Sequence, residues 1–257
     1  METADMKIAG RIVLAILGPL VTVALFIMPV LLFHAYSWLK VAIYIGEISG
    51  ALLLIGWYRK TTSLDFGLKI IGSWSGLLWC ILYLFIRVAA WIVLIPQVRI
   101  ETNWHILLIQ AGFFLLLNAM GEEIHFRGLL FSSLSSGLWS RSVLIAAFVS
   151  SGIFALFHIL DFLSSGWLWF FLIACDGLAL CAIRIKTKSV FWSVLVHGIL
   201  NLCTGSLFIG AQTVDDAVVY LYMAVVVIID LLFFIFLFNQ AHRQQEQAGA
   251  LIPSQAS

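Results

Sequence analysis

The chain has 257 residues, of which 63% are hydrophobic and only 11% are charged. This composition excludes an ordinary soluble globular domain and is typical of an integral membrane protein, so the lipid bilayer is the expected surrounding. A formal net charge of +1 offers no basic surface, and nucleic acid is therefore not an expected partner.

Apolar windows of about 20 residues predict about eight transmembrane helices. They lie near residues 12–36, 38–57, 70–96, 104–131, 142–160, 166–183, 189–209 and 217–238. We therefore predict an all-α, multi-pass transmembrane helical bundle that forms one domain over residues 1–238. The remaining stretch, 239–257, is polar and Gln-rich, and we predict that it is a disordered tail.

Basic residues outside these windows or near their ends segregate to one side of the predicted membrane. An even number of spans places both termini on the same side, and the loops of that side hold most of the Lys and Arg residues, whereas the other side holds only Lys40 and Arg99. Positively charged loops face the cytoplasm. We therefore expect both termini to be cytoplasmic.

The fourth window contains the densest group of charges, in the sequence GEEIHFRGLLF from Gly121 to Phe131. Each charge at membrane depth costs about 3 kcal/mol on insertion scales, so such a group indicates a functional site. On a helix, Glu123 and Arg127 stand four residues apart and can form an ion pair. Glu122 points about 100° away, on a face where Asn118 lies one turn earlier and His125 one turn later.

Two further polar motifs interrupt later windows. Phe154 and His158 close the fifth window with the spacing Phe-x-x-x-His, and the seventh contains His197 and Asn201 with the spacing His-x-x-x-Asn. Residues four apart share one helical face. Together with Glu122 these motifs supply a base, two imidazoles and a carboxamide.

The order of the three motifs resembles the CPBP family, the CAAX protease and bacteriocin-processing (Abi) group of intramembrane glutamic endopeptidases. Its Glu-Glu-x-x-x-Arg motif matches Glu122, Glu123 and Arg127, and its other two motifs match Phe154 with His158 and His197 with Asn201. The resemblance covers about residues 104–204. It implies an integral protein of a bacterial cell membrane that hydrolyses a peptide bond of a membrane-associated peptide or protein, which in part of the family is prenylated.

The resemblance also implies roles for the motif residues. Glu122 would act as general base on a water held with the help of His158, and His197 and Asn201 would stabilise the oxyanion. Glu123 and Arg127 would be a supporting pair. The implied mechanism uses no metal and no organic cofactor.

Two alternatives remain open at this point. The polar residues could pack or bind a peptide in a non-catalytic scaffold or immunity protein. Glu122, His158 and His197 could also be ligands of a catalytic zinc ion, although the helical His-Glu-x-x-His motif of zinc proteases is missing.

The depth of the two motif histidines poses a geometric question. At 1.5 Å per residue, His197 lies about 13 Å from the start of its window and His158 about 24 Å from the start of its own. Tilted helices, or a fifth span that begins deeper than residue 142, would allow them to meet.

Other residues in the apolar windows receive no catalytic role. His125 is expected to be structural or to contact the catalytic residues without contacting the substrate. Trp167 and Trp169 are expected to anchor the protein at the membrane interface. Four charged residues within the windows could pair across helices or line a cavity, and all cysteines are expected to be buried thiols. These are Glu47, Arg87, Asp176 and Asp230, and Cys80, Cys175, Cys181 and Cys203.

Overall fold

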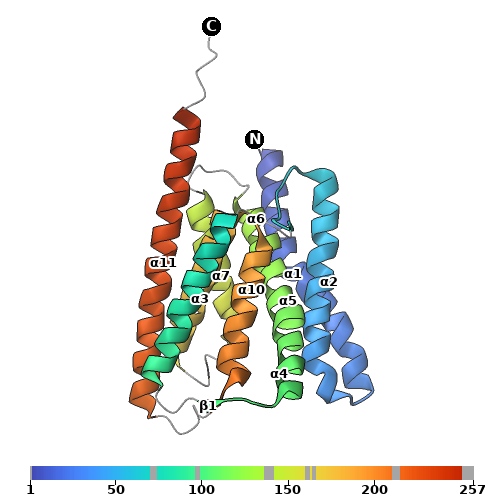
Figure 1. Ribbon diagram of the computed structural model, residues 1–257. Helices are drawn as coiled ribbons and strands as arrows, with labels where there is room; N and C mark the ends of the chain where they lie inside the picture. Colours follow the sequence, from blue (N-terminus) through green and yellow to red (C-terminus); the bar gives the residue numbers. More distant parts are fainter. Residues whose placement is uncertain are drawn as a thin grey trace.

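The computed structural model of the chain is a bundle of helices that run roughly parallel to one another (Figure 1). It describes residues 2–69, 74–95, 99–135, 142–159, 163, 166–209 and 215–250. The predicted all-α, multi-pass architecture is confirmed. α1 begins and α11 ends at the same end of the bundle, and β1 lies at the opposite end (Figure 1).

The elements of the first half are α1 (Glu2–Leu32), η1 (Tyr36–Trp38), α2 (Leu39–Thr61), α3 (Trp74–Leu94), β1 (Arg99–Ile100), α4 (Trp104–Ala111), η2 (Gly112–Ala119), α5 (Met120–Glu123), η3 (Ile124–Leu130) and α6 (Phe131–Ser135). Those of the second half are α7 (Ser142–Phe157), α9 (Trp167–Thr187), α10 (Val190–Leu202), η4 (Cys203–Leu207), β2 (Phe208–Ile209) and α11 (Asp216–Ala250). The two short strands pair antiparallel, with Arg99 opposite Ile209 and Ile100 opposite Phe208.

Six helices within the described ranges are long and apolar enough to cross a bilayer, which makes this an integral membrane protein. The fifth and seventh predicted spans correspond to the shorter helices α7 and α10, of 16 and 13 residues. At 1.5 Å per residue these are about 24 Å and 20 Å long, so neither crosses the full apolar core alone. The expectation of about eight spans therefore holds for the number of apolar helices, with two of them short.

The last helix is longer than the sequence suggested. α11 continues to Ala250, so the part of the expected disordered tail from Asn239 to Ala250 is helical. Residues 251–257 lie outside the described residues.

The fourth span is one continuous helical rod, Trp104–Ser135, built from α4, η2, α5, η3 and α6. Two of its segments, η2 and η3, have π-helical geometry, in which each turn holds more residues than an α-helical turn. π-Helical turns are rare and frequently lie at functional sites. Between the two segments lies α5, whose Glu122 and Glu123 are both buried.

α10 begins inside the protein, and this answers the question of depth. Ser189 and Val190 at its start are buried, and Val190 N donates to Gly67 O in the connection between α2 and α3. A helix that starts below the surface brings His197 deeper than its distance along the chain indicates. His158 and His197 consequently line the same cavity.

Candidate active site

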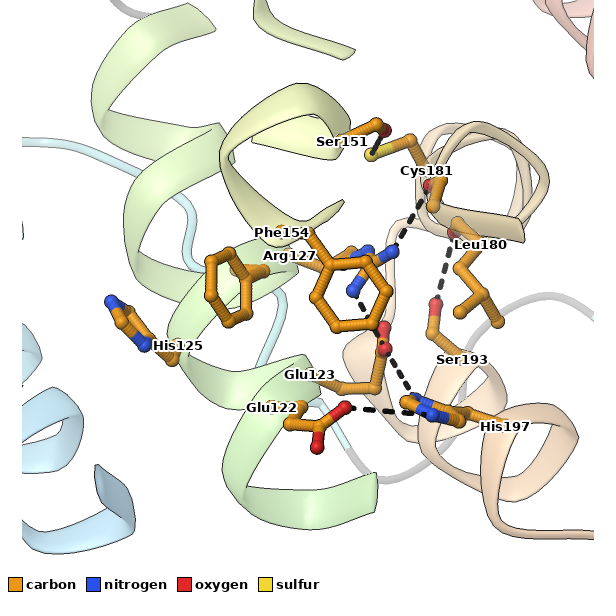
Figure 2. A network of polar contacts seen from close by, with 12 residues as sticks. Glu122, Glu123, His125, Arg127, Ser151, Phe154, Leu180, Cys181, Ser193 and His197 are labelled. Carbon is orange, nitrogen blue, oxygen red and sulfur yellow. Dashed lines mark hydrogen bonds and ion pairs between the residues drawn. The ribbon is translucent and has the colours of Figure 1, made fainter. Parts of the chain in front are cut away.

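Glu123 connects the charged motif of the fourth span to α10. Its Oε1 accepts a hydrogen bond of 2.8 Å from Arg127 Nη1 and another of 2.8 Å from His197 Nδ1. The predicted pairing of Glu123 with Arg127 is therefore present, but the bond to His197 was not foreseen. Figure 2 shows the carboxylate between the guanidinium and the imidazole.

Arg127 is held on three sides. It is fully buried, its Nη2 donates to Gly177 O of α9 at 3.1 Å, and its guanidinium carbon lies 4.4 Å from the centre of the Phe154 ring. A cation over an aromatic face is stabilised by the ring quadrupole. Arg127 thus joins the fourth span to α7 and α9, and the phenylalanine of the Phe-x-x-x-His motif covers the ion pair.

Glu122 points to a different set of partners. Its Oε1 accepts a hydrogen bond of 2.6 Å from Asn118 Nδ2, and Asn118 Oδ1 in turn accepts one of 2.7 Å from Asn201 Nδ2. Its Oε2 lies 3.6 Å from His197 Nε2 and has no hydrogen-bond partner among the described residues. One carboxylate oxygen is therefore fixed by the amide chain, while the other faces His197 and is available to a small ligand such as water.

Sequence spacing had placed Asn118 next to Glu122 but had given it no role. In the structure it relays a hydrogen bond from α10 to the carboxylate. The feature of the sequence that could have indicated this role is the position of Asn118 one helical turn before Glu122.

His158 follows the end of α7 and completes the group of motif residues. Its Nδ1 lies 3.0 Å from Phe154 O, and its ring centre is 4.8 Å from that of Phe154. Because Phe154 O can only accept, Nδ1 is the donor and Nε2 is left for another partner. His158 lines a cavity of about 600 Å³ together with Glu122, His197, Asn118 and Asn201.

His125 lies elsewhere, contrary to the expectation that it shares a face with Glu122. Its ring bonds to Glu47 Oε1 at 2.8 Å and to Ala15 O at 3.0 Å, and Figure 2 shows it directed away from Glu122 and His197. The π-helical geometry of η3, which begins at Ile124, turns the chain by fewer degrees per residue and moves His125 off that face. Its expected structural role agrees with these contacts, which join the fourth span to α1 and α2.

The cavity also has walls that the motifs did not indicate. Arg87, Asp176 and Trp169 line it, although Trp169 was expected to be an interface anchor. Trp167, in contrast, is 69% exposed at the start of α9. The cysteines are free and buried.

The described residues contain no group of three or more His, Cys, Asp or Glu side chains arranged to hold a metal ion. The motif residues instead bond to one another, in the pairs Glu123 with His197 and Glu122 with Asn118. The charges of the group are compact: two carboxylates, one guanidinium and one imidazole lie within direct contact.

Of the comparisons with known proteins, one gives a match. No curated protein and no solved structure matches the chain. Residues 103–203 match the family model described as type II CAAX prenyl endopeptidase Rce1-like. This segment runs from the N-cap of α4 to the beginning of η4, and it contains all three motifs. Over residues 103–203, the chain is therefore similar to the Rce1-like CAAX prenyl endopeptidases.

Proposed function

We propose that this protein is an intramembrane endopeptidase in which Glu122 activates the water that hydrolyses the peptide bond. One observation in particular supports this: Glu122 Oε2 is buried without a hydrogen-bond partner among the described residues, in a cavity shared with His158 and His197. A carboxylate fixed through one oxygen and open at the other is suited to accept a proton from water.

In the first step, water lies between Glu122 Oε2 and His158. Glu122 takes one proton of this water as its oxygen bonds to the carbonyl carbon of the substrate, and a tetrahedral oxyanion forms. In the second step, the C–N bond breaks and the same proton passes from Glu122 to the leaving amine. Glu122 ends as a carboxylate, and the water is divided between the two products.

His197 and Asn201 stabilise the oxyanion. Glu123 pairs with Arg127 and is therefore a hydrogen-bond acceptor, so His197 Nδ1 donates to it. To donate from Nε2 as well, His197 must be an imidazolium. The group Glu122, Glu123, Arg127 and His197 is then neutral, which suits the apolar interior of a membrane protein.

This charge balance is kept during the reaction. When Glu122 takes the proton, its negative charge is replaced by that of the oxyanion, which forms beside the same imidazolium. Preorganised donors next to a developing charge, where water is scarce, are the largest contribution to many enzymatic rates. The second N–H of Asn201 Nδ2, beyond the one given to Asn118, is the remaining donor.

The substrate is a membrane-associated peptide or protein, because the cavity lies within a bundle of membrane-spanning helices. The family description names prenylated CAAX chains, and the bacteriocin-processing members of the resembled family make an unprenylated peptide a second candidate. The reaction is independent of metal and cofactor. We also place both termini in the cytoplasm, a proposal that rests on the distribution of Lys and Arg and on the common end of α1 and α11.

The purified protein in detergent tests this function directly. It is incubated with a membrane-anchored peptide in water enriched in ¹⁸O, and the products are analysed by mass spectrometry. We expect one new carboxylate that contains a single ¹⁸O and one new amine. A peptide that remains intact, or a product without ¹⁸O, would refute hydrolysis by activated water. Membrane peptides that accumulate uncleaved in a deletion strain would identify the natural substrate.

A further inference from the structure

A second charged group, outside the motifs, borders the same cavity. It consists of Tyr83 and Arg87 of α3, Asp176 of α9 and Asp230 of α11, and we call it the Arg87 cluster. Arg87 Nη1 donates to Asp230 Oδ1 at 2.7 Å, to Tyr83 OH at 2.8 Å and to Asp176 Oδ1. Tyr83 OH donates to Asp230 Oδ1 at 2.7 Å. None of these residues belongs to the matched segment except Asp176.

The members of the Arg87 cluster differ in their access to the cavity. Arg87 and Asp176 line the cavity, as do Glu122 and His197. The side chain of Asp176 is 25% exposed, whereas that of Asp230 is completely buried. Asp176 is therefore the carboxylate that a molecule in the cavity can reach.

The Arg87 cluster contains two carboxyl groups but only one guanidinium. Both carboxyl groups bond to the same Nη1 of Arg87. The group around Glu122, in contrast, is neutral when His197 is an imidazolium. A surplus carboxylate in an apolar interior is costly and is stabilised by a positive charge or a proton. A cationic group that enters the cavity and reaches Asp176 supplies that charge.

The part of the cavity wall near Arg87 also offers hydrogen-bond donors to a peptide. Arg87 Nε and Trp169 Nε1 are buried N–H groups with no hydrogen-bond partner among the described residues, and both side chains line the cavity. Arg87 is only 5% exposed, so its unpaired N–H is costly unless a ligand supplies an acceptor. Backbone carbonyl oxygens of a peptide are such acceptors.

Aromatic rings complete the surroundings. Trp91 and Tyr222 line the cavity and meet edge to face, with ring centres 4.8 Å apart. Rings of this kind attract ammonium and guanidinium groups. The wall therefore combines a surplus carboxylate, unpaired N–H donors and aromatic rings, which together suit a residue with a basic side chain.

We propose that Asp176 and Arg87 form a specificity subsite that binds a Lys or Arg side chain of the peptide being cleaved. The inference rests on the proposed function, because the subsite and the Glu122 group border one cavity. Asp176 attracts the basic side chain, and Arg87 keeps the Asp176 carboxylate in place.

The test uses membrane-anchored peptides that are identical except for one residue, which is Lys, Gln or Glu and is moved stepwise along both sides of the cleaved bond. For the full-length wild-type protein we expect one position at which kcat/KM for the Lys peptide exceeds that for the Gln peptide at least tenfold. Asp176→Asn should remove this preference, so that its kcat/KM values for the Lys and Gln peptides lie within about threefold of each other. Asp216→Asn, an exposed position at the start of α11, is the matched control and should keep the preference.

Cleavage of the Gln peptide also shows that the variant is folded, and Asp176→Ser provides a second variant if Asp176→Asn is unstable. The proposal is overturned if no position favours Lys, if the preference survives both Asp176 variants, or if Glu is favoured, because the last result would mean that Arg87 binds an anionic group.

Binding separates this proposal from the proposed function. Fluorescent Lys and Gln peptides are titrated onto Glu122→Gln, which we expect to bind without cleaving. The Lys peptide should bind at least tenfold more tightly than the Gln peptide. The double variant Glu122→Gln with Asp176→Asn should bind the two peptides equally. If the wild type cleaves the Lys and Gln peptides equally and Glu122→Gln binds them equally, the subsite is refuted and the endopeptidase is not. If Glu122→Gln binds the Lys peptide preferentially but the wild type cleaves neither peptide, the endopeptidase is refuted and the subsite is not.

Discussion

Glu123 Oε1 and His197 Nδ1 are joined by a hydrogen bond of 2.8 Å. This bond directs the other ring nitrogen, Nε2, toward Glu122, whose Oε2 lies 3.6 Å away. A carboxylate that fixes the orientation and tautomer of an imidazole in this way is common at metal and catalytic sites. Glu123 is thus both the counter-ion of Arg127 and the group that orients His197.

Loss of either partner of the buried ion pair should destabilise the protein. Glu123→Gln leaves the completely buried Arg127 without its counter-ion, and Arg127→Gln leaves Glu123 in the corresponding state. We expect each variant to lose on the order of 3 kcal/mol of unfolding free energy as well as activity. Thermal unfolding in detergent, compared with wild type, measures this loss.

The double variant Glu123→Gln with Arg127→Gln distinguishes a charge effect from a packing effect. It contains no unpaired charge and should be more stable than either single variant. If all three variants unfold at the wild-type temperature, the ion pair does not support the fold.

His158 should matter for activity and little for stability. Its Nδ1 bonds only to its own helical turn, at Phe154 O, among the contacts of the described residues, so its removal breaks no link between helices. We expect His158→Ala to lower kcat at least about 100-fold, as for a group that positions or exchanges protons with the reacting water, with a near-normal melting temperature.

His105→Ala, at an exposed position in the first turn of α4, is the control for removal of an imidazole and should retain activity. A cellular phenotype that persists with His158→Ala, while the protein is present in the membrane, would favour the non-catalytic scaffold.

The contact between α1 and α2 should tolerate no side chain at Gly46. A Cβ there would lie 2.7 Å from Val23 Cα and 3.0 Å from Val23 N, so the backbones of the two helices would have to separate. Small residues permit such close helix packing in membranes. Gly46→Ala should cost about 1–3 kcal/mol of unfolding free energy.

Gly56 is the matched control on the same helix, because a Cβ at that position would meet nothing within 4 Å. Gly56→Ala should leave stability unchanged or raise it by up to about 1 kcal/mol. Equal melting temperatures for the two variants would mean that α1 and α2 are not held together at Gly46.

Peptide cleavage should persist in the presence of a strong metal chelator, because Glu122 and His197 each have a partner within the protein and the proposed mechanism uses no metal. Activity of the purified protein is measured before and after chelation. Activity that disappears on chelation and returns with added zinc would replace the glutamate mechanism with the zinc alternative.

The sequence predicts the class of fold and the residues that share one helical face, because apolar windows and residues four apart on a helix are local patterns. The pairing of Glu123 with Arg127 and the position of Asn118 beside Glu122 follow from the same spacing. The convergence of the three motifs was expected from their order in the chain and from the family resemblance. Contacts between separate helices could not be predicted, because they depend on how those helices pack. The bond from His197 to Glu123 requires the relative rotation of the fourth span and α10.

Two other differences have causes that the sequence does not display. The displacement of His125 follows from the π-helical segment η3. The depth of His197 follows from the burial of Val190 beneath the α2–α3 connection. Arg87, Asp176 and Asp230 were visible as charges in apolar windows, but their meeting depends on three helices that are distant in sequence.

The most direct test of the account is the cleavage rate of one membrane-anchored peptide by wild type and by Glu122→Gln, with the melting temperature of both proteins measured in the same detergent. The amide oxygen of Gln can still accept the hydrogen bond from Asn118 Nδ2, so the fold keeps its contact and only the base is lost. We predict a fall in cleavage of at least about 100-fold with a near-normal melting temperature. A stable Glu122→Gln that cleaves the peptide at the wild-type rate would contradict the assignment of Glu122 as the general base.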